Sequence, residues 1–341
     1  MDAPWRITFD TNPDICNLNC IMCEEHSNYR TTERKYKRIM DVQIIEKVVE
    51  SAVDRGLREI IPSTMGEPLL YRDFERIIDL VKKFDLKMNL TTNGTFSGRG
   101  VKEWGGMILP VASDVKISIN GATKYTSEMI MNGISHEKLI ENITDLIKIR
   151  DSFRRNNWNE PTITFQVTYM ENNLKELPAI LKMAIDMDVD RFKGHHLWVT
   201  WPELTIQSLR RNKNSIKRWN SMVEILHKIA ENSRLSNGNK FKLENVYKIK
   251  TDDISSIVPS HWRCPFVGNE AWIAWDGTFN VCCSPDALRK KFGYFGNVKD
   301  DDFIELWKGR KYSEFIRKWG VSEVCGKCNM RRPPDEHKDE N

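Results

Sequence analysis

The sequence predicts an α/β protein in which parallel strands are covered by helices, as either an open doubly wound sheet or a barrel. Two observations lead to this fold class. Short apolar segments alternate with amphipathic helical stretches six times, at fairly even intervals. The pattern then changes after about residue 235, where a hairpin and one more helix indicate a second, smaller unit. In folds of repeated βα units, the loops at the C-terminal ends of the strands carry the chemistry.

The six βα units follow one another along the first two thirds of the chain. The first helix has Asp41 as a plausible N-cap and Gly56 as its C-terminal stop. The expected strands are 5–10, 58–64, 86–92, 114–119, 162–170 and 190–199, and the helices that follow them are 41–56, 71–84, 101–109, 135–153, 174–187 and 215–233.

The C-terminal third contains different elements. Asp276-Gly277 is a strong hairpin turn signal between two apolar strands. The expected elements are a linker with a short strand at 236–260, the hairpin at 270–284, a helix at 301–320 and a C-x2-C turn at 324–328. We therefore expect a barrel-like domain at 1–235, a small domain at 236–330 and a disordered tail at 331–341.

Composition narrows the function classes. The 341 residues are 40% hydrophobic and 29% charged, as in an ordinary globular protein. The net charge of +4, from 52 basic and 48 acidic residues, is too small to indicate nucleic acid or a membrane surface as a partner. The sequence has neither a signal-peptide pattern nor an apolar run of the ~18 residues that a membrane span needs. We expect a cytoplasmic protein.

The eight cysteines fall into two groups. Cys16, Cys20 and Cys23 lie within eight residues near the start, and the other five follow residue 260. A disulfide scaffold spreads its cysteines through a short secreted chain, whereas tight spacing in a long intracellular chain indicates metal ligation. The alternative is a set of scattered buried thiols.

The C-x3-C-x2-C loop of the first group follows the first strand. Such a loop can wrap three thiolates around one face of a cubane iron–sulfur cluster and leave the fourth iron free to chelate a ligand. Structural zinc sites, in contrast, close with four protein ligands. The spacing therefore favours a cluster with one open corner.

Over residues 5 to about 200 the sequence resembles the radical S-adenosylmethionine (radical SAM) enzyme superfamily. Gly66-Glu67-Pro68 resembles the family's Gly-Gly-Glu region, Thr92-Asn93-Gly94 its Thr-Asn-Gly turn, and the stretch around Ser118 its Ser-Ile-Asp-Gly strand. The resemblance implies a partial (βα)6 barrel. It also implies that backbone carbonyls and the Glu67 carboxylate meet the cofactor's ammonium, and that Ser118 contacts its ribose or carboxylate. Each turn taken alone could be a simple turn.

Two positions depart from the family pattern. Met22 stands before the third cysteine, where an aromatic residue is usual, and it can still cover adenine as a polarizable apolar surface. The arginine that often pairs with the cofactor carboxylate has no counterpart in the stretch 129–135. Lys116 and Lys193 are candidates for that role.

The second cysteine group resembles the SPASM/Twitch modules of the same superfamily, in the shorter Twitch form with one auxiliary cluster. Gly277 is followed by four residues and then a cysteine, and a late C-x2-C closes the pattern. The resemblance implies that the ligands of a second [4Fe–4S] cluster are Cys264, Cys282, Cys325 and Cys328. A structural zinc in the same four thiolates is the alternative.

Cys283 is left over from this ligand set. Adjacent strand residues point to opposite faces, so we expect Cys283 to face away from the cluster that Cys282 binds. It is either a buried thiol or a catalytic thiol that donates hydrogen to a substrate radical. After the sixth strand, His195, His196, Trp198 and Trp201 either line a substrate cavity or pack, with at most one histidine facing inward.

The resemblance implies an activity. One electron from the first cluster cleaves S-adenosylmethionine to methionine and a 5′-deoxyadenosyl radical, which abstracts hydrogen from a substrate. A flavodoxin- or ferredoxin-type protein would supply the electron. We expect a small polar metabolite of the sugar or aminocyclitol type, for oxidation or epimerisation, because the cysteine loop begins by residue 16 and leaves no room for a peptide-binding domain before it. A ribosomal peptide is the alternative substrate, and a non-enzymatic zinc or electron-transfer protein is the alternative of another class.

Overall fold

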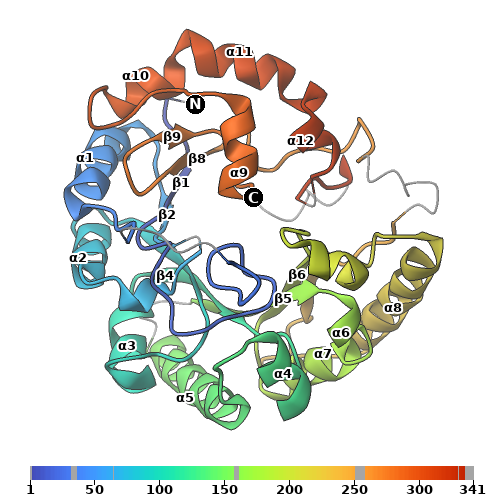
Figure 1. The fold of residues 1–341 in the computed structure, drawn as a ribbon. Helices are drawn as coiled ribbons and strands as arrows, with labels where there is room; N and C mark the ends of the chain where they lie inside the picture. Colours follow the sequence, from blue (N-terminus) through green and yellow to red (C-terminus); the bar gives the residue numbers. More distant parts are fainter. Residues whose placement is uncertain are drawn as a thin grey trace.

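The fold is one mixed α/β unit with a single twisted, mostly parallel sheet. The computed structural model describes residues 2–31, 37–63, 65–156, 161–249, 258–328 and 330–334. The sheet has nine strands in the order β7-β6-β5-β4-β3-β2-β1-β8-β9, and only the β8–β9 pair among the described strands is antiparallel. Figure 1 shows the helices arranged around the outside of these strands.

The six strands expected for the barrel are all present and follow one another in the sheet. Strands β1 to β6 span Arg6–Phe9, Glu59–Ile61, Lys87–Thr92, Ala112–Ser118, Thr162–Tyr169 and Arg191–His196, and β7, β8 and β9 span Lys242–Glu244, Glu270–Ile273 and Phe279–Asn280. The sequential parallel pairing of β1 to β6 follows from the helical crossovers between them.

The helices begin and end near the predicted residues. The Asp41 side chain accepts a hydrogen bond from the Gln43 amide and caps the first helix, and Gly56 adopts φ +119° after it, as the sequence predicted. Helices α1 to α8 span Val42–Ala52, Phe74–Lys83, Gly100–Ile108, Lys124–Ile130, His136–Arg155, Glu171–Leu174, Leu177–Asp186 and Lys213–Glu231; α9 to α12 span Asp286–Arg289, Phe303–Lys308, Arg310–Lys318 and Glu323–Gly326.

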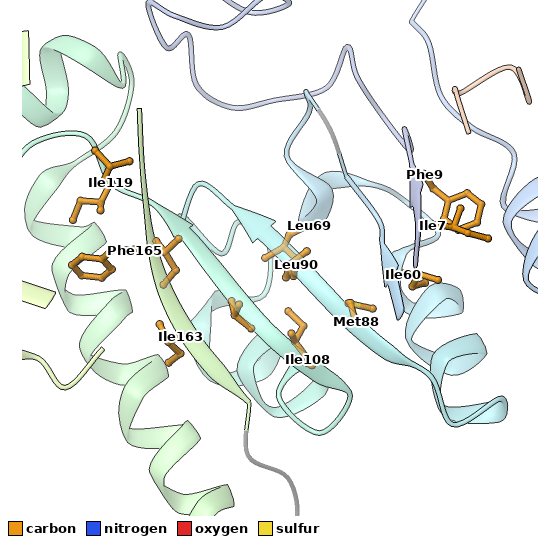
Figure 2. Close-up of a cluster of buried hydrophobic side chains, with 14 of the residues drawn as sticks. Ile7, Phe9, Ile60, Leu69, Met88, Leu90, Ile108, Ile119, Ile163 and Phe165 are labelled. Carbon is orange, nitrogen blue, oxygen red and sulfur yellow. The ribbon is translucent and has the colours of Figure 1, made fainter. Parts of the chain in front are cut away.

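Apolar side chains fill the space between the strands and the surrounding helices. Figure 2 shows a group of them, from the strands and from helical residues such as Ile108 on α3. Ile7, Ile60 and Ile163 are fully buried there. The opposite face of the strands is polar, because the period of a strand is two and the alternate residues point into the barrel.

Ion pairs close the N-terminal end of this polar interior. Arg6, at the start of β1, pairs with Glu59 of β2 and Glu270 of β8. On the other side, Asp114 of β4 pairs with Arg191 of β6 at 2.7 Å. Buried charges need such partners. The C-terminal ends of the strands are therefore the end of the barrel at which a ligand can enter.

Two features of the C-terminal third were not expected from the sequence. The strand in the expected linker, β7, pairs with β6, and β8 pairs with β1, so the sheet runs across the expected boundary at residue 235. The expected helix 301–320 breaks at Gly309, whose ψ of 153° is extended and separates α10 from α11.

The expected disordered tail begins with placed residues. Arg331 is 2% exposed and donates to the backbone carbonyl of Trp262 at 2.7 Å, and Arg332 pairs with Arg263 in a β-bridge. The rest of that tail, 335–341, lies outside the described residues. In the described chain, no helix combines the length and apolar character needed to cross a membrane.

Candidate active site

The three front cysteines lie on the loop between β1 and α1, at the C-terminal end of β1. The backbone amide of Cys23 donates to the carbonyl of Cys20 at 3.0 Å, which curls the second half of the loop. Burial, followed by repulsion from the thiolates of Cys23 and Cys16, raises the pKa of Cys20. Burial also raises the pKa of Cys23 to about 11. Three thiols that repel one another as thiolates need a bound cation or cluster to stay ionised together.

The Gly66-Glu67-Pro68 turn packs directly against this loop. A Cβ atom at Gly66 would collide with the backbone carbonyl oxygen of Asn12, so only glycine permits the approach. The Asn12 side chain donates to the carbonyl of Glu67 at 2.8 Å, and the Glu67 amide donates to the carbonyl of Ile15 at 2.9 Å. These bonds fix the turn after β2 against Ile15, the residue that precedes Cys16.

The Glu67 carboxylate holds the next turn. It accepts from Thr92 Oγ1 at 2.7 Å and from the Asn93 amide at 2.8 Å, and Glu67 is only 2% exposed. Burial raises the pKa of Glu67 to about 7, against the lowering effect of the hydrogen bonds from Asn93 and Thr92. The contact between Glu67 and the cofactor ammonium stays a prediction, and the two hydrogen bonds fix where the carboxylate lies.

The Thr92-Asn93-Gly94 turn reaches the cysteines through Asn93. The side-chain Nδ2 of Asn93 lies 3.8 Å from the Cys16 sulfur and donates a hydrogen bond to Asn17 Oδ1 at 2.8 Å. Gly94 adopts φ +77°, in the left-handed region, and a Cβ there would approach Leu139 and Ile117 closely. An amide donor beside a ligand sulfur is one of the contacts that tune an iron–sulfur cluster.

Two other expected cofactor residues lie near this edge. Met22 is partly buried on the cysteine loop, and Ser118 is half-buried at the end of β4, in register with Gln166 of β5. The lysines considered as carboxylate partners are engaged inside the barrel: Lys116 lies 3.6 Å from Asp114 and Lys193 3.0 Å from Glu244.

The back cysteines also come together. Cys264 precedes β8, Cys282 follows β9, Cys325 lies on α12 and Cys328 follows it. Burial, followed by the thiolates of Cys328 and Cys282, raises the pKa of Cys264 to about 12. The same thiols act on Cys325 and Cys328, so the four predicted ligands form one electrostatic cluster.

Cys283 lies close to this cluster. Its thiol interacts with that of Cys282, which lowers the pKa of Cys282 to about 6, and the thiolates of Cys328 and Cys264 help to raise the pKa of Cys283. The prediction assumed strand geometry, but β9 ends at Asn280. Beyond a strand the side chains no longer alternate, so neighbouring thiols can point the same way.

Both thiol clusters suit a group larger than one ion. Within the part of the chain that is described, no three His, Cys, Asp or Glu side chains lie close enough to hold a single metal ion. In a four-iron cluster each thiolate binds a different iron, so the sulfur atoms need not meet at one point. The residues that could hold such clusters are the front three cysteines and, at the back, Cys264, Cys282, Cys325 and Cys328.

A buried arginine, which the sequence did not single out, connects the two regions. Arg38 pairs with Asp14 at 2.8 Å and with Glu25 at 2.8 Å, at the two ends of the cysteine loop. It also pairs with Asp286, the first residue of α9, at 3.0 Å. No local pattern predicts this contact, because its partners are far apart in the sequence.

A cavity of about 260 Å³ lies between the loop after β6 and the back cysteines. Its lining includes Trp198, Arg210, Lys291 and Lys327. Of the other residues expected here, His195 faces the barrel interior and contacts Gln166, whereas His196 packs between Tyr169 and Trp219. The expectation that at most one of these histidines faces inward is confirmed.

Trp201 is directed to the front loop. Its indole nitrogen donates to the backbone carbonyl of Cys23 at 3.0 Å. This hydrogen bond joins the segment after β6 to the third cysteine of the loop. Trp201 therefore has a structural role at the front loop.

Known protein families match both cysteine regions of the sequence. The sequence model of the radical SAM superfamily matches residues 13–184, half of the chain, and that of an iron–sulfur cluster-binding domain (SPASM) matches residues 264–329. The first match contains the front cysteines and both turns. The second begins at Cys264 and ends just after Cys328.

Three known proteins are similar over almost the whole chain, at low sequence identity. The tungsten-containing aldehyde ferredoxin oxidoreductase cofactor-modifying protein of Pyrococcus furiosus is 24% identical, over 93% of this chain and 85% of its own length. The structure of Streptococcus suis SuiB bound to S-adenosylmethionine superposes with a TM-score of 0.66 at 15% identity, over 96% of this chain and 72% of SuiB. Native anSMEcpe with bound S-adenosylmethionine gives a TM-score of 0.66 at 18% identity, over 95% and 86%.

Proposed function

Because this chain belongs to the radical SAM superfamily, we propose that it abstracts a hydrogen atom from a small polar metabolite of the sugar or aminocyclitol type, for oxidation or epimerisation. It is a radical SAM enzyme with a C-terminal SPASM domain. These two domains imply a [4Fe–4S] cluster, S-adenosylmethionine and at least one further iron–sulfur cluster as cofactors. The substrate class and the reaction type are the proposed part.

One observation carries the proposal for the front site: three cysteines with raised pKa values meet two turns from neighbouring strands at one edge of the sheet. Cys16, Cys20 and Cys23 would hold the cluster. When bound, the cluster supplies the electron that cleaves S-adenosylmethionine to methionine and a 5′-deoxyadenosyl radical. A flavodoxin- or ferredoxin-type protein would in turn reduce it.

The chain's own residues would position the cofactor. The Gly66-Glu67-Pro68 turn offers its backbone at the closest approach to the cysteine loop. Asn93 would orient the Cys16 sulfur, and Ser118 and Met22 would contact the ribose and adenine portions. Glu67 and Thr92 would act as positioning residues, because Thr92 Oγ1 donates a hydrogen bond to the Glu67 carboxylate at 2.7 Å and so joins the two turns. Holding the reacting groups in place is the main contribution that the protein makes to such chemistry.

The back site would serve the substrate. Cys264, Cys282, Cys325 and Cys328 would hold the auxiliary cluster, which would orient substrate or accept an electron from it. Cys283 lies close to these thiols and is partly buried. In an epimerisation Cys283 would donate a hydrogen atom to the substrate radical, whereas in an oxidation it would not be needed.

The cavity beside the back cysteines supports a small substrate. Its volume of about 260 Å³ lies just below the usual range for small-molecule sites, and half of its lining residues are polar or charged, namely Ser208, Arg210, Lys291, Glu323 and Lys327. A peptide substrate is the second candidate, favoured by the likeness to SuiB, which has also been solved with the precursor peptide SuiA.

Deuterium transfer distinguishes the two substrate classes. The reconstituted enzyme is incubated separately with deuterated sugars and aminocyclitols and with a deuterated peptide library, and 5′-deoxyadenosine is analysed by mass spectrometry. The proposal predicts deuterated 5′-deoxyadenosine from a sugar or aminocyclitol. Deuterium from the peptides alone would establish the peptide alternative.

A further inference from the structure

Four residues at or between the two cysteine regions have buried polar side-chain atoms. Glu24 directly follows Cys23, and Arg289 ends α9, the helix that begins four residues after Cys282. The Arg38 ion pairs with Asp14 and Asp286 hold these two segments together. In Figure 1, α9 lies next to the β8–β9 hairpin. Helix α9 is therefore tied to the front cysteine loop as well as following Cys282 in the chain.

Arg289 is buried without a full set of partners. It is 5% exposed, and its Nε and Nη1 atoms have no hydrogen-bond acceptor among the described residues. Only Nη2 is engaged, with Asp286 and, at 3.9 Å, with Asp10. Leaving buried donors of a charged group without acceptors costs free energy, so such a group often marks a ligand site.

The groups around Arg289 share this property. Its guanidinium carbon lies 5.9 Å from the ring centre of Trp272 on β8, whose indole nitrogen is buried and unpartnered within the described ranges. Thr8 lies opposite Trp272 in register on β1, and its hydroxyl has no partner in that part of the chain either. The same holds for Oε2 of Glu24. Thr8 points into the barrel, because its neighbours Ile7 and Phe9 fill the face covered by helices.

This combination of groups determines which ligand fits. Arg289 and Trp272 can only donate hydrogen bonds, a Glu24 carboxylate oxygen accepts them, and the Thr8 hydroxyl can do both. A free anion is disfavoured, because Glu24, Asp10 and Asp286 all lie around the one guanidinium. A hydroxyl group both donates and accepts, so several hydroxyls on one ring would satisfy all four residues.

We propose that Arg289, Trp272, Glu24 and Thr8 form the substrate-recognition site and bind the hydroxyl groups of a polyhydroxylated ring. The inference rests on the proposed function and adds to it the residues that select the substrate. Hydroxyls held there would place the ring carbon atoms between the two cysteine regions. Because buried polar groups are strongly selective against ligands that leave them unpaired, this site would reject an apolar side chain.

Binding of known polyols tests the site directly. Glucose, myo-inositol and glucosamine are titrated into the reconstituted holoenzyme, with S-adenosylmethionine present, and binding is followed by saturation-transfer NMR and calorimetry. We expect at least one of them to bind at millimolar concentration. Arg289→Lys, Trp272→Phe and Glu24→Gln should each weaken that binding roughly tenfold or more, since each loses a hydrogen bond at a buried site. The exposed Arg310, which pairs with Glu314 on the surface, provides the control Arg310→Gln, which should bind as the wild type does.

Other outcomes would overturn the inference. No binding of any of the three polyols, or binding that all variants retain, would remove the site. Tighter binding of acetate or inorganic phosphate, lost in Arg289→Lys, would assign it to an anion. If Arg289→Lys loses iron, its weaker binding cannot be assigned to the lost hydrogen bond. Trp272→Phe then tests the site, because it keeps an aromatic ring and removes only the indole N–H donor. Polyol binding without any release of 5′-deoxyadenosine would support the site and contradict the proposed function. Release of 5′-deoxyadenosine together with polyol binding that the variants do not affect would support the proposed function and contradict the site.

Discussion

The carboxylate of Glu67 accepts a hydrogen bond from Thr92 Oγ1 at 2.7 Å, and both side chains are buried. This bond joins the turn after β2 to the turn after β3, beside the loop that holds Cys16. The relative position of the two turns therefore depends on a carboxylate that the sequence analysis assigned to the cofactor.

Glu67 should make the stability depend on pH. Its pKa is about 7 in the folded protein, raised by burial from the ordinary value of 4.5, so the folded state holds this proton more tightly than the unfolded state does. The free energy of unfolding of the wild type, relative to the non-titrating variant Glu67→Gln, should fall by roughly 2–3 kcal/mol as the pH rises from about 4.5 to about 7, and then level off. Anaerobic thermal unfolding of both proteins across this window measures it. A difference in Tm that stays constant would show that the hydrogen bonds from Asn93 and Thr92 balance burial, and a wild-type Tm that rises with pH relative to the variant would show that they outweigh it.

Asn93 should tune the front cluster. Its amide nitrogen lies 3.8 Å from the Cys16 sulfur, and donors near ligand sulfurs raise the reduction potential of a cluster. Asn93→Ala should lower the potential of the front cluster, on the order of tens of millivolts, in a redox titration followed by electron paramagnetic resonance. Asn220→Ala is the control, because Asn220 bonds to the backbone of Ile249 on the far side of α8. An unchanged potential in Asn93→Ala would exclude the contact as a determinant.

Arg38 should matter far more for stability than a surface arginine. The variant Arg38→Gln deprives Asp14 and Glu25, which are almost fully buried, of their shared guanidinium, at a cost of about 3–5 kcal/mol. Arg76→Gln removes an exposed pair with Glu46 and should cost less than about 1 kcal/mol. Thermal unfolding compares the two variants, and iron content shows whether the loop still binds its cluster. Equal losses of Tm would mean that the buried network contributes no more than a surface pair.

Cys283 can be distinguished from Cys282 by iron content and by isotope. Cys282→Ala should lose the iron of the auxiliary cluster, whereas Cys283→Ala should keep about eight irons, as two four-iron clusters. With the substrate in deuterated water, a hydrogen-donating Cys283 would place deuterium in the wild-type product, and the variant would cleave the cofactor without completing the product. Loss of iron in Cys283→Ala would make it a ligand, and product without deuterium from both proteins would favour oxidation. Stoichiometric zinc without sulfide in the wild type would replace the auxiliary cluster by a structural zinc site.

Much of the fold could be predicted because its signals are local. The six barrel strands are short apolar runs with turn residues at their ends, and the structure contains all six. Asp41 and Gly56 mark the ends of the first helix by side-chain and backbone preferences that need no tertiary contact. The cysteine groups were recognisable because ligand spacing is itself a local property.

The remaining features depend on contacts between distant segments. The sequence cannot show that Thr92 and the backbone amide of Asn93 donate hydrogen bonds to the Glu67 carboxylate. The orientation of Cys283 depends on where β9 ends, which is set by pairing with β8 and is not visible in the sequence. The Arg38 and Arg289 contacts join residues more than 200 positions apart, and no periodic pattern indicates them.

The central claim is that the front cysteines hold the cluster that cleaves S-adenosylmethionine, and release of 5′-deoxyadenosine tests it most directly. Anaerobically reconstituted wild-type protein, with dithionite and S-adenosylmethionine, should release 5′-deoxyadenosine slowly even without substrate. Cys20→Ala should release none, because losing one of three ligands loses the cluster. Equal release from the wild type and from Cys20→Ala would contradict the assignment of this loop.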